Sequence, residues 1–181
     1  MELELSSTHL NRRKPDWISA LVAGLVAGGV AMVMDLLWTS LILGHNPWHT
    51  SYLVAALVMG PDLLQGSTQG FNLGVVAVAL LTHYMLGMVF GVAIAAVITA
   101  VRSESSLPLM MTIGAFCGGT LYGFNFYVMA EVFPWVVELR GESYVVEHYI
   151  FGMTAAFMYW KLKARSSPRR SARRSSSCRR S

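Results

Sequence analysis

Residues 17–43 read WISALVAGLVAGGVAMVMDLLWTSLIL, an unbroken run of mostly apolar side chains. A helix of roughly 20 apolar residues, rising about 1.5 Å per residue, spans the hydrocarbon core of a bilayer, and this run is longer. It also exceeds the roughly 7–15 apolar residues of a cleavable signal sequence. The stretch therefore predicts an uncleaved transmembrane helix that is tilted or extends beyond the hydrocarbon.

Composition extends this prediction to most of the chain. The 181 residues are 54% apolar and 13% charged, with a mean hydropathy of +0.49, whereas soluble domains carry about 25% charge. Asn46-Pro47 is typical of a helix start and predicts a short interfacial helix on the outer face near residues 47–59. We predict an all-α, four-helix transmembrane bundle over residues 17–163, with spans at 17–43, 71–101, 107–133 and 144–162.

The second half of the chain repeats motifs of the first half. Residues 24–29 (GLVAGG) are followed after five residues by Asp35, and residues 114–119 (GAFCGG) are followed after five residues by Asn125. A Pro-Trp pair comes next in each half, and then a matching string: HYMLGM at 83–88 and HYIFGM at 148–153. The pattern indicates two parallel helical-hairpin repeats related by an axis along the membrane normal.

Basic residues predict the orientation of the bundle. Of the 14 lysines and arginines, all but Arg140 lie before the first predicted helix, between the second and third, or after the start of the C-terminal basic run at Lys161. Because basic residues favour the cytoplasmic side, both termini are expected in the cytoplasm, with the protein in the cytoplasmic (inner) membrane. Residues 1–16 then form a cytoplasmic lead-in.

Residues 164–181 are rich in arginine and serine and carry no large apolar side chains, so we predict a disordered tail. Such a run can bind nucleic acid, but a basic segment next to a membrane more often binds anionic lipid headgroups, at about 1 kcal/mol per basic residue. Nucleic acid is therefore the less favoured partner. Headgroup contacts are predicted for Arg165, Arg169, Arg170, Arg173 and Arg174.

Polar groups within the predicted spans are the candidates for function, because ionisable side chains are costly in a bilayer. His83 and His148 occupy matching positions of the two repeats, so they are expected at one depth, facing the bundle interior. Asp35 is expected to point inward, within reach of His83 or of its counterpart Asn125. Together these side chains predict an outward-facing polar centre.

The histidine pair has two interpretations. Each histidine is followed four residues later by glycine on the same helix face, which could leave space for a haem with two axial histidines. A transition metal is also possible, with Asp35 or other nearby side chains as further ligands. Alternatively, the histidines only bond neighbouring carbonyls or carboxylates, and the glycines only permit helix contact. Further candidate ligands are His45, His49 and Glu147.

Glu147 and Glu131 lie near the outer interface, where solvated carboxylates are the favoured interpretation. No motif of a nucleophilic, phosphate-binding or zinc-dependent enzyme is present, so no enzyme class is supported.

The glycine-rich first and third helices, the Pro-Trp turn, and His83 and His148 make residues 17–162 resemble small bacterial four-helix membrane proteins of unknown function. This resemblance implies fold and location only. The leading functional hypothesis is a membrane binding or accessory protein, with a small oligomeric transporter or channel for protons or a solute as the alternative. The third hypothesis is a structural subunit of a larger membrane complex. The transporter or channel hypothesis implies a homo-oligomer.

Overall fold

The computed structural model describes residues 15–65, 69–102 and 106–178, with side chains as far as residue 164. Throughout these ranges the chain is helical and contains no strand, as predicted. The long elements are α1 (Trp17–Leu37), α2 (His49–Met59), α3 (Leu73–Ala100), α4 (Leu107–Gly123) and α5 (Glu142–Cys178). Short helical segments connect them: η1 (Trp38–Ile42), η2 (Pro61–Leu64), η3 (Phe124–Val128), η4 (Met129–Glu131) and η5 (Pro134–Leu139).

Local sequence signals set the helix ends. The side chain of Asp16 accepts a hydrogen bond from the backbone N–H of Ser19 at the start of α1, and Asn72 caps α3 in the same way. Pro108 lies in the first turn of α4, where its missing N–H costs nothing. Gly60 ends α2 with φ of +94°, a conformation that glycine adopts most easily.

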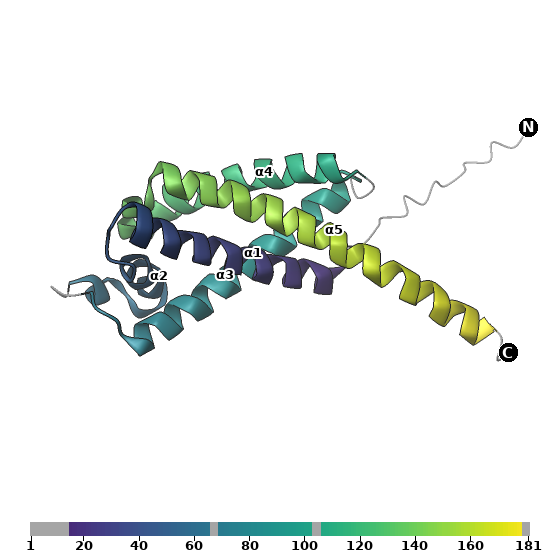
Figure 1. Ribbon diagram of the computed structural model, residues 1–181, viewed down its shortest axis with the longest axis horizontal. Coiled ribbons are helices and arrows are strands. Elements are labelled where there is room, and N and C mark those ends of the chain that lie inside the picture. The colour runs from purple at the N-terminus through teal and green to yellow at the C-terminus, as the bar shows by residue number, and fades with distance from the viewer. Residues whose placement is uncertain (1–14, 66–68, 103–105, 179–181) are drawn as a thin grey trace, which may run out of the picture.

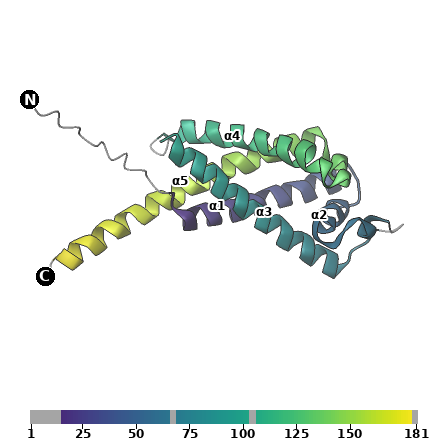
Figure 2. The same ribbon diagram turned by 180° about the vertical axis from the view of Figure 1, so that it is seen from behind.

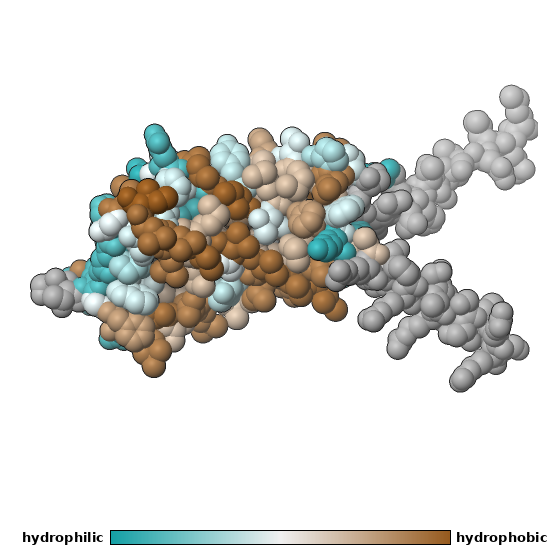
Figure 3. Space-filling model, in the orientation of Figure 1, coloured by the Kyte–Doolittle hydropathy of each residue, from teal (hydrophilic) through white to brown (hydrophobic). Residues whose placement is uncertain are grey.

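Three helices of the described chain are long and apolar enough to cross a membrane: Trp17–Ile42, Leu73–Ala100 and Leu107–Glu131. Large apolar side chains on all three face outward, including Ile18 (75% exposed), Leu73 (72%) and Phe116 (75%). Apolar residues cover much of the visible surface, and polar residues gather mainly toward its ends (Figure 3). Such a surface is stable in lipid rather than in water, so the protein is a helical membrane protein.

Helix α5 differs from these three. It carries Glu147, His148 and Lys161 in the part that we predicted to be the fourth span, and it is not among the helices apolar enough to cross by composition. It also continues to Cys178, through the segment predicted to be disordered. An established helix extends without a new nucleation cost, which favours this continuation. The five arginines predicted to contact headgroups have side chains outside the described part, as do residues 1–14 of the lead-in.

The helices are arranged around α5, which packs most extensively against α4 and α1 (Figures 1 and 2). Polar contacts join three helices at one end. The backbone N–H of Asp16 donates to the hydroxyl of Tyr159 at 3.2 Å, and the hydroxyls of Tyr159 and Thr99 lie 3.3 Å apart. The start of α1 therefore lies beside the end of α3 and the middle of α5. We call this the inner end, and the opposite end, which carries α2 and η5, the outer end.

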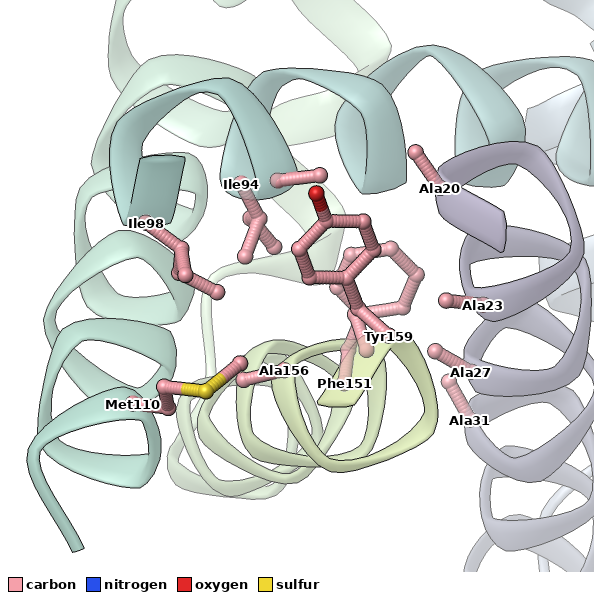
Figure 4. Close-up of a cluster of buried hydrophobic side chains, with 12 residues drawn as sticks. Ala20, Ala23, Ala27, Ala31, Ile94, Ile98, Met110, Phe151, Ala156 and Tyr159 are labelled. Carbon is pink, nitrogen blue, oxygen red and sulfur yellow. The ribbon is translucent and has the colours of Figure 1, made fainter. Parts of the chain in front are cut away.

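A close-packed core fills the inner half. Tyr159 and Phe151 of α5 lie against a row of small side chains on α1 (Figure 4). Tyr159 is 1% exposed, and Ile98 of α3 is fully buried. The α1 row consists of Ala20, Ala23, Ala27 and Ala31, whose short side chains let the two helices approach closely.

Glycines hold α1 against α3 and α4 against α5. A methyl group added to Gly24 would collide with the backbone of Gly87 and Gly91. In the other pair, a methyl group on Gly114 would lie 2.5 Å from the carbonyl oxygen of Gly152. The space at the glycine after each histidine is therefore occupied by the backbone of the neighbouring helix, which contradicts the space for a flat ligand expected there.

The outer end is closed by segments from both halves of the chain. Helix α2 packs against α3, and its Leu53 is 1% exposed. The indole N–H of Trp135 in η5 donates to the carbonyl of Leu53 at 3.2 Å. These segments form a cap over the helix ends, and the candidate site lies directly beneath it.

Candidate functional site

A cavity of about 630 Å³ lies beneath the cap, among α1, α2, α3, α5 and the outer end of α4. Ligand pockets commonly have volumes of about 300–1,000 Å³ and mainly apolar walls with a few polar groups. This cavity has that character. Its polar lining residues are Asp35, Thr50, Ser51, Thr82, His83, Asn125, Tyr144, Glu147 and His148.

Asp35 accepts hydrogen bonds from two threonines. The hydroxyls of Thr39 and Thr50 each lie 3.4 Å from its Oδ1. The Thr50 hydroxyl also lies 3.2 Å from the hydroxyl of Tyr144. Either of these two hydroxyls can donate to the other, and the Tyr144 hydroxyl also lies within hydrogen-bonding reach of Asp35. The result is a chain of hydroxyls from α5 through α2 to α1. Asp35 shares the cavity with His83 and Asn125, but among the described residues its hydrogen bonds are to the threonines.

His83 bonds across the α1–α3 contact. Its Nε2 lies 2.9 Å from the carbonyl oxygen of Gly28. A carbonyl only accepts, so Nε2 carries the proton. The edge of the neighbouring Tyr84 ring packs against the imidazole, with centroids 5.9 Å apart. His83 thus lines the cavity and is hydrogen-bonded to α1. This agrees with the alternative in which the histidine bonds a neighbouring carbonyl.

His148 has partners at both ring nitrogens. Its Nδ1 lies 2.8 Å from the carbonyl oxygen of Tyr144 and therefore donates, while its Nε2 lies 3.1 Å from the amide nitrogen of Asn125 and accepts. The rings of Tyr122 and Phe126 pack edge-on against it. Asn125 is thus the polar partner of His148 rather than of Asp35. Metal coordination by His148 Nε2 requires displacing this amide.

Glu147 is the main correction to the sequence-based site. We expected it to be solvated, and it is 8% exposed and lines the cavity. Among the described residues its carboxylate has no hydrogen bond or ion pair, and it lies close enough to Asp35 for the two charges to repel. It lies on the face of α5 that lines the cavity, and α5 packs extensively against α1. Glu131, by contrast, is exposed as expected.

His45 and His49 do not join the cavity. His45 is exposed. The Nδ1 of His49 lies 2.6 Å from the side-chain oxygen of Gln69, and its Nε2 lies 3.2 Å from Glu138. Within the described chain no three histidine, cysteine or acidic side chains are grouped so as to hold a metal. His45 and His49 thus lie outside the set of residues that line the cavity with His83 and His148.

Sequence reasoning missed Thr50 and Tyr144. Tyr144 lies at the start of the predicted fourth span, and Thr50 falls in the short helix predicted near residues 47–59. No periodic signal marks either residue. Their role depends on α2 folding back over the bundle, which local sequence does not encode.

No family model, curated protein or solved structure matches this chain. Its class is defined by its own fold and site: an all-helical membrane protein with a capped cavity that gathers two carboxylates and two histidines.

Proposed function

We propose that this protein binds a small, largely apolar molecule in the capped cavity beneath α2 and η5. The observation that carries the proposal is convergence: Asp35, His83, Asn125, Glu147 and His148 come from four helical segments, α1, α3, η3 and α5, and all line one cavity of about 630 Å³. A cavity that served only packing would be filled, because voids of this size cost stability. The polar groups would fix the orientation of the ligand and the apolar walls would supply most of the affinity.

The proposed setting is the cytoplasmic membrane, with α5 as a fourth span and both termini in the cytoplasm. Two observations support it. Helix α5 runs along α1 and α4 (Figure 1), and in the sequence the basic residues flank the ends of α1, α3 and α5 that meet at the inner end. The matching glycine contacts in α1–α3 and α4–α5 support two parallel hairpin repeats.

Binding is favoured over conduction because the inner half offers no path. Tyr159 and Ile98 are buried in the core between the cavity and the inner end. A transporter would have to separate α5 from α1 there. Binding is also favoured over a haem or metal centre, since the nitrogens of His148 are both engaged and its glycine neighbour is covered by α4.

A cavity-filling variant tests the proposal. Thr82 lines the cavity, whereas the side chain of the adjacent Leu81 is 61% exposed on the surface of α3 and does not line the cavity. The probes are tetraphenylphosphonium, tetraphenylborate and neutral triphenylphosphine oxide, measured by equilibrium dialysis against protein in lipid nanodiscs, with empty nanodiscs subtracted. We expect saturable binding of at least one probe, weakened by about tenfold or more in Thr82→Trp because the added ring occupies the cavity.

The matched control is Leu81→Trp, which adds the same ring to the lipid-facing side and should bind like wild type. Circular dichroism and gel filtration check that both variants are folded. Absence of saturable binding of all three probes would overturn the proposed function. A Soret band in the purified protein would replace it with the haem hypothesis.

A further inference from the structure

The charges that line the cavity are unbalanced. Asp35 and Glu147 both contribute carboxylates, and no lysine or arginine is among the lining residues. Both face the same cavity, so they repel each other when both are ionised. Burying carboxylates without a cation is costly, so two of them in a mainly apolar cavity indicate that a positive partner is missing.

A second observation concerns the hydrogen bonds of Glu147 rather than the repulsion between the two carboxylates. It is 8% exposed, it lines the cavity, and no described residue donates a hydrogen bond to it. Asp35, by contrast, accepts bonds of 3.4 Å from Thr39 and Thr50 and also lies within hydrogen-bonding reach of the Tyr144 hydroxyl. No fully enclosed side-chain oxygen or nitrogen of the described residues lacks a partner, so the unbonded carboxylate of Glu147 keeps access to the cavity that it lines.

The nearest described guanidinium is already engaged. The Nε of Arg140 donates to the carbonyl of Phe126 at 2.7 Å, and its guanidinium lies 4.3 Å from the centre of the Tyr127 ring. It is not among the residues that line the cavity. His148 accepts from Asn125 at one nitrogen and donates at the other, so its hydrogen bonds are those of a neutral ring.

The remaining walls suit an apolar cation. Aromatic side chains line the cavity, among them Trp48, Phe126 and Tyr144. The faces of such rings attract organic cations, with Trp the strongest. Inorganic cations, by contrast, need several oxygen ligands at short distance, and this lining is predominantly carbon.

We infer that the ligand of this cavity is a lipophilic organic cation, an amine or quaternary onium ion carrying apolar groups, which is held by Asp35 and Glu147. The inference rests on the proposed function and adds the chemical class of the ligand. The cationic centre lies between the two carboxylates, and its apolar substituents contact the aromatic walls.

Charge-matched probes test the inference. Tetraphenylphosphonium and tetraphenylborate have nearly the same shape and opposite charge. The variants are Glu147→Gln and Asp35→Asn, which keep side-chain size and remove one charge each. We expect each variant to weaken tetraphenylphosphonium binding by about tenfold or more, as for loss of a charge-assisted contact. Tetraphenylborate binding should be unchanged or stronger in the same variants.

Glu131→Gln is the control, because it removes an exposed carboxylate from η4, at a position that does not line the cavity. It should leave the binding of both probes unchanged. If wild type binds the anion or the neutral probe and both cavity variants bind tetraphenylphosphonium like wild type, the cation inference is wrong while the binding function stands. If no probe binds, the proposed function fails first. Folding of each variant is checked by its thermal transition in detergent.

Discussion

The α1–α3 pair and the α4–α5 pair share their packing and differ in their polar groups. In both pairs glycines from the two helices touch through backbone atoms, and a tyrosine ring covers the next glycine, Tyr84 over Gly29 and Tyr149 over Gly119. The polar ends diverge. His83 bonds a backbone carbonyl, whereas His148 bonds Asn125, the counterpart of Asp35.

This difference shows which parts of a helix pair are constrained. The glycine contacts are backbone to backbone, so any side chain there would force the helices apart. The polar groups face a cavity, where one can change without moving a helix. Each pair also carries a different cap, the α2 helix in one and the short η5 in the other.

The strongest test of the comparison is orientation, because parallel repeats require both hairpins to face the same way. Reporter fusions after Gln65 and Gly141 should both report the outer side, and a fusion after Arg102 should report the cytoplasm. Paired alkaline phosphatase and green fluorescent protein fusions make the measurement. Opposite signals at Gln65 and Gly141 would rule out the parallel arrangement.

The glycine contacts predict the next largest effect. A methyl group at Gly152 would overlap the Gly114 carbonyl and lie 2.9 Å from the backbone nitrogen of Gly118, whereas one at Gly87 would lie 3.1 Å from the Gly24 carbonyl. Overpacking of this kind costs about 1–3 kcal/mol. We expect Gly152→Ala to lower the unfolding temperature in detergent clearly, and Gly87→Ala to lower it less.

Gly123 supplies the matched control, since a methyl group there would meet nothing within 4 Å. Gly123→Ala should be neutral or stabilising by roughly 0.5–1 kcal/mol, as expected for removing glycine from a helix. Equal destabilisation at all three positions would mean that the contacts are not specific.

Exchanging Asp35 and its counterpart Asn125 should change stability less than the glycine substitutions do, and the loss should come mainly from the change at Asn125. Asn125→Asp removes the N–H that the His148 ring accepts and adds a third carboxylate to the cavity. We expect a loss of stability of about 1–2 kcal/mol, measured as a shift of the thermal transition. Asp35→Asn should change stability little, because its amide oxygen still accepts from Thr39 and Thr50. The reverse ranking would place the structural role on Asp35.

The sequence predicted the helices well and the site in part. Apolar length alone placed helices at 17–43, 71–101 and 107–133, close to the observed Trp17–Ile42, Leu73–Ala100 and Leu107–Glu131. The repeat also placed His83 and His148 beside one cavity. Helical periodicity identifies which residues share a face, but not which neighbour covers that face.

The errors in the predicted site arise because the sequence does not show which neighbour covers each helix face. The glycines after the histidines are covered by backbone from α1 and α4, and Glu147 is buried by helices remote in sequence. Thr50 reaches Asp35 only because α2 folds over the bundle.

The smallest expected effect concerns the bridge between the two caps. His49 of α2 and Glu138 of η5 lie 3.2 Å apart, with side chains 41% and 57% exposed. Solvent screens such a pair, which limits its worth to about 0–1 kcal/mol. Glu138→Gln should therefore shift the thermal transition only slightly, whereas Trp135→Phe, which removes the buried bond to Leu53, should shift it more. If Glu138→Gln caused the larger loss, the caps would be joined mainly by charge, and high salt should then loosen them in the wild type.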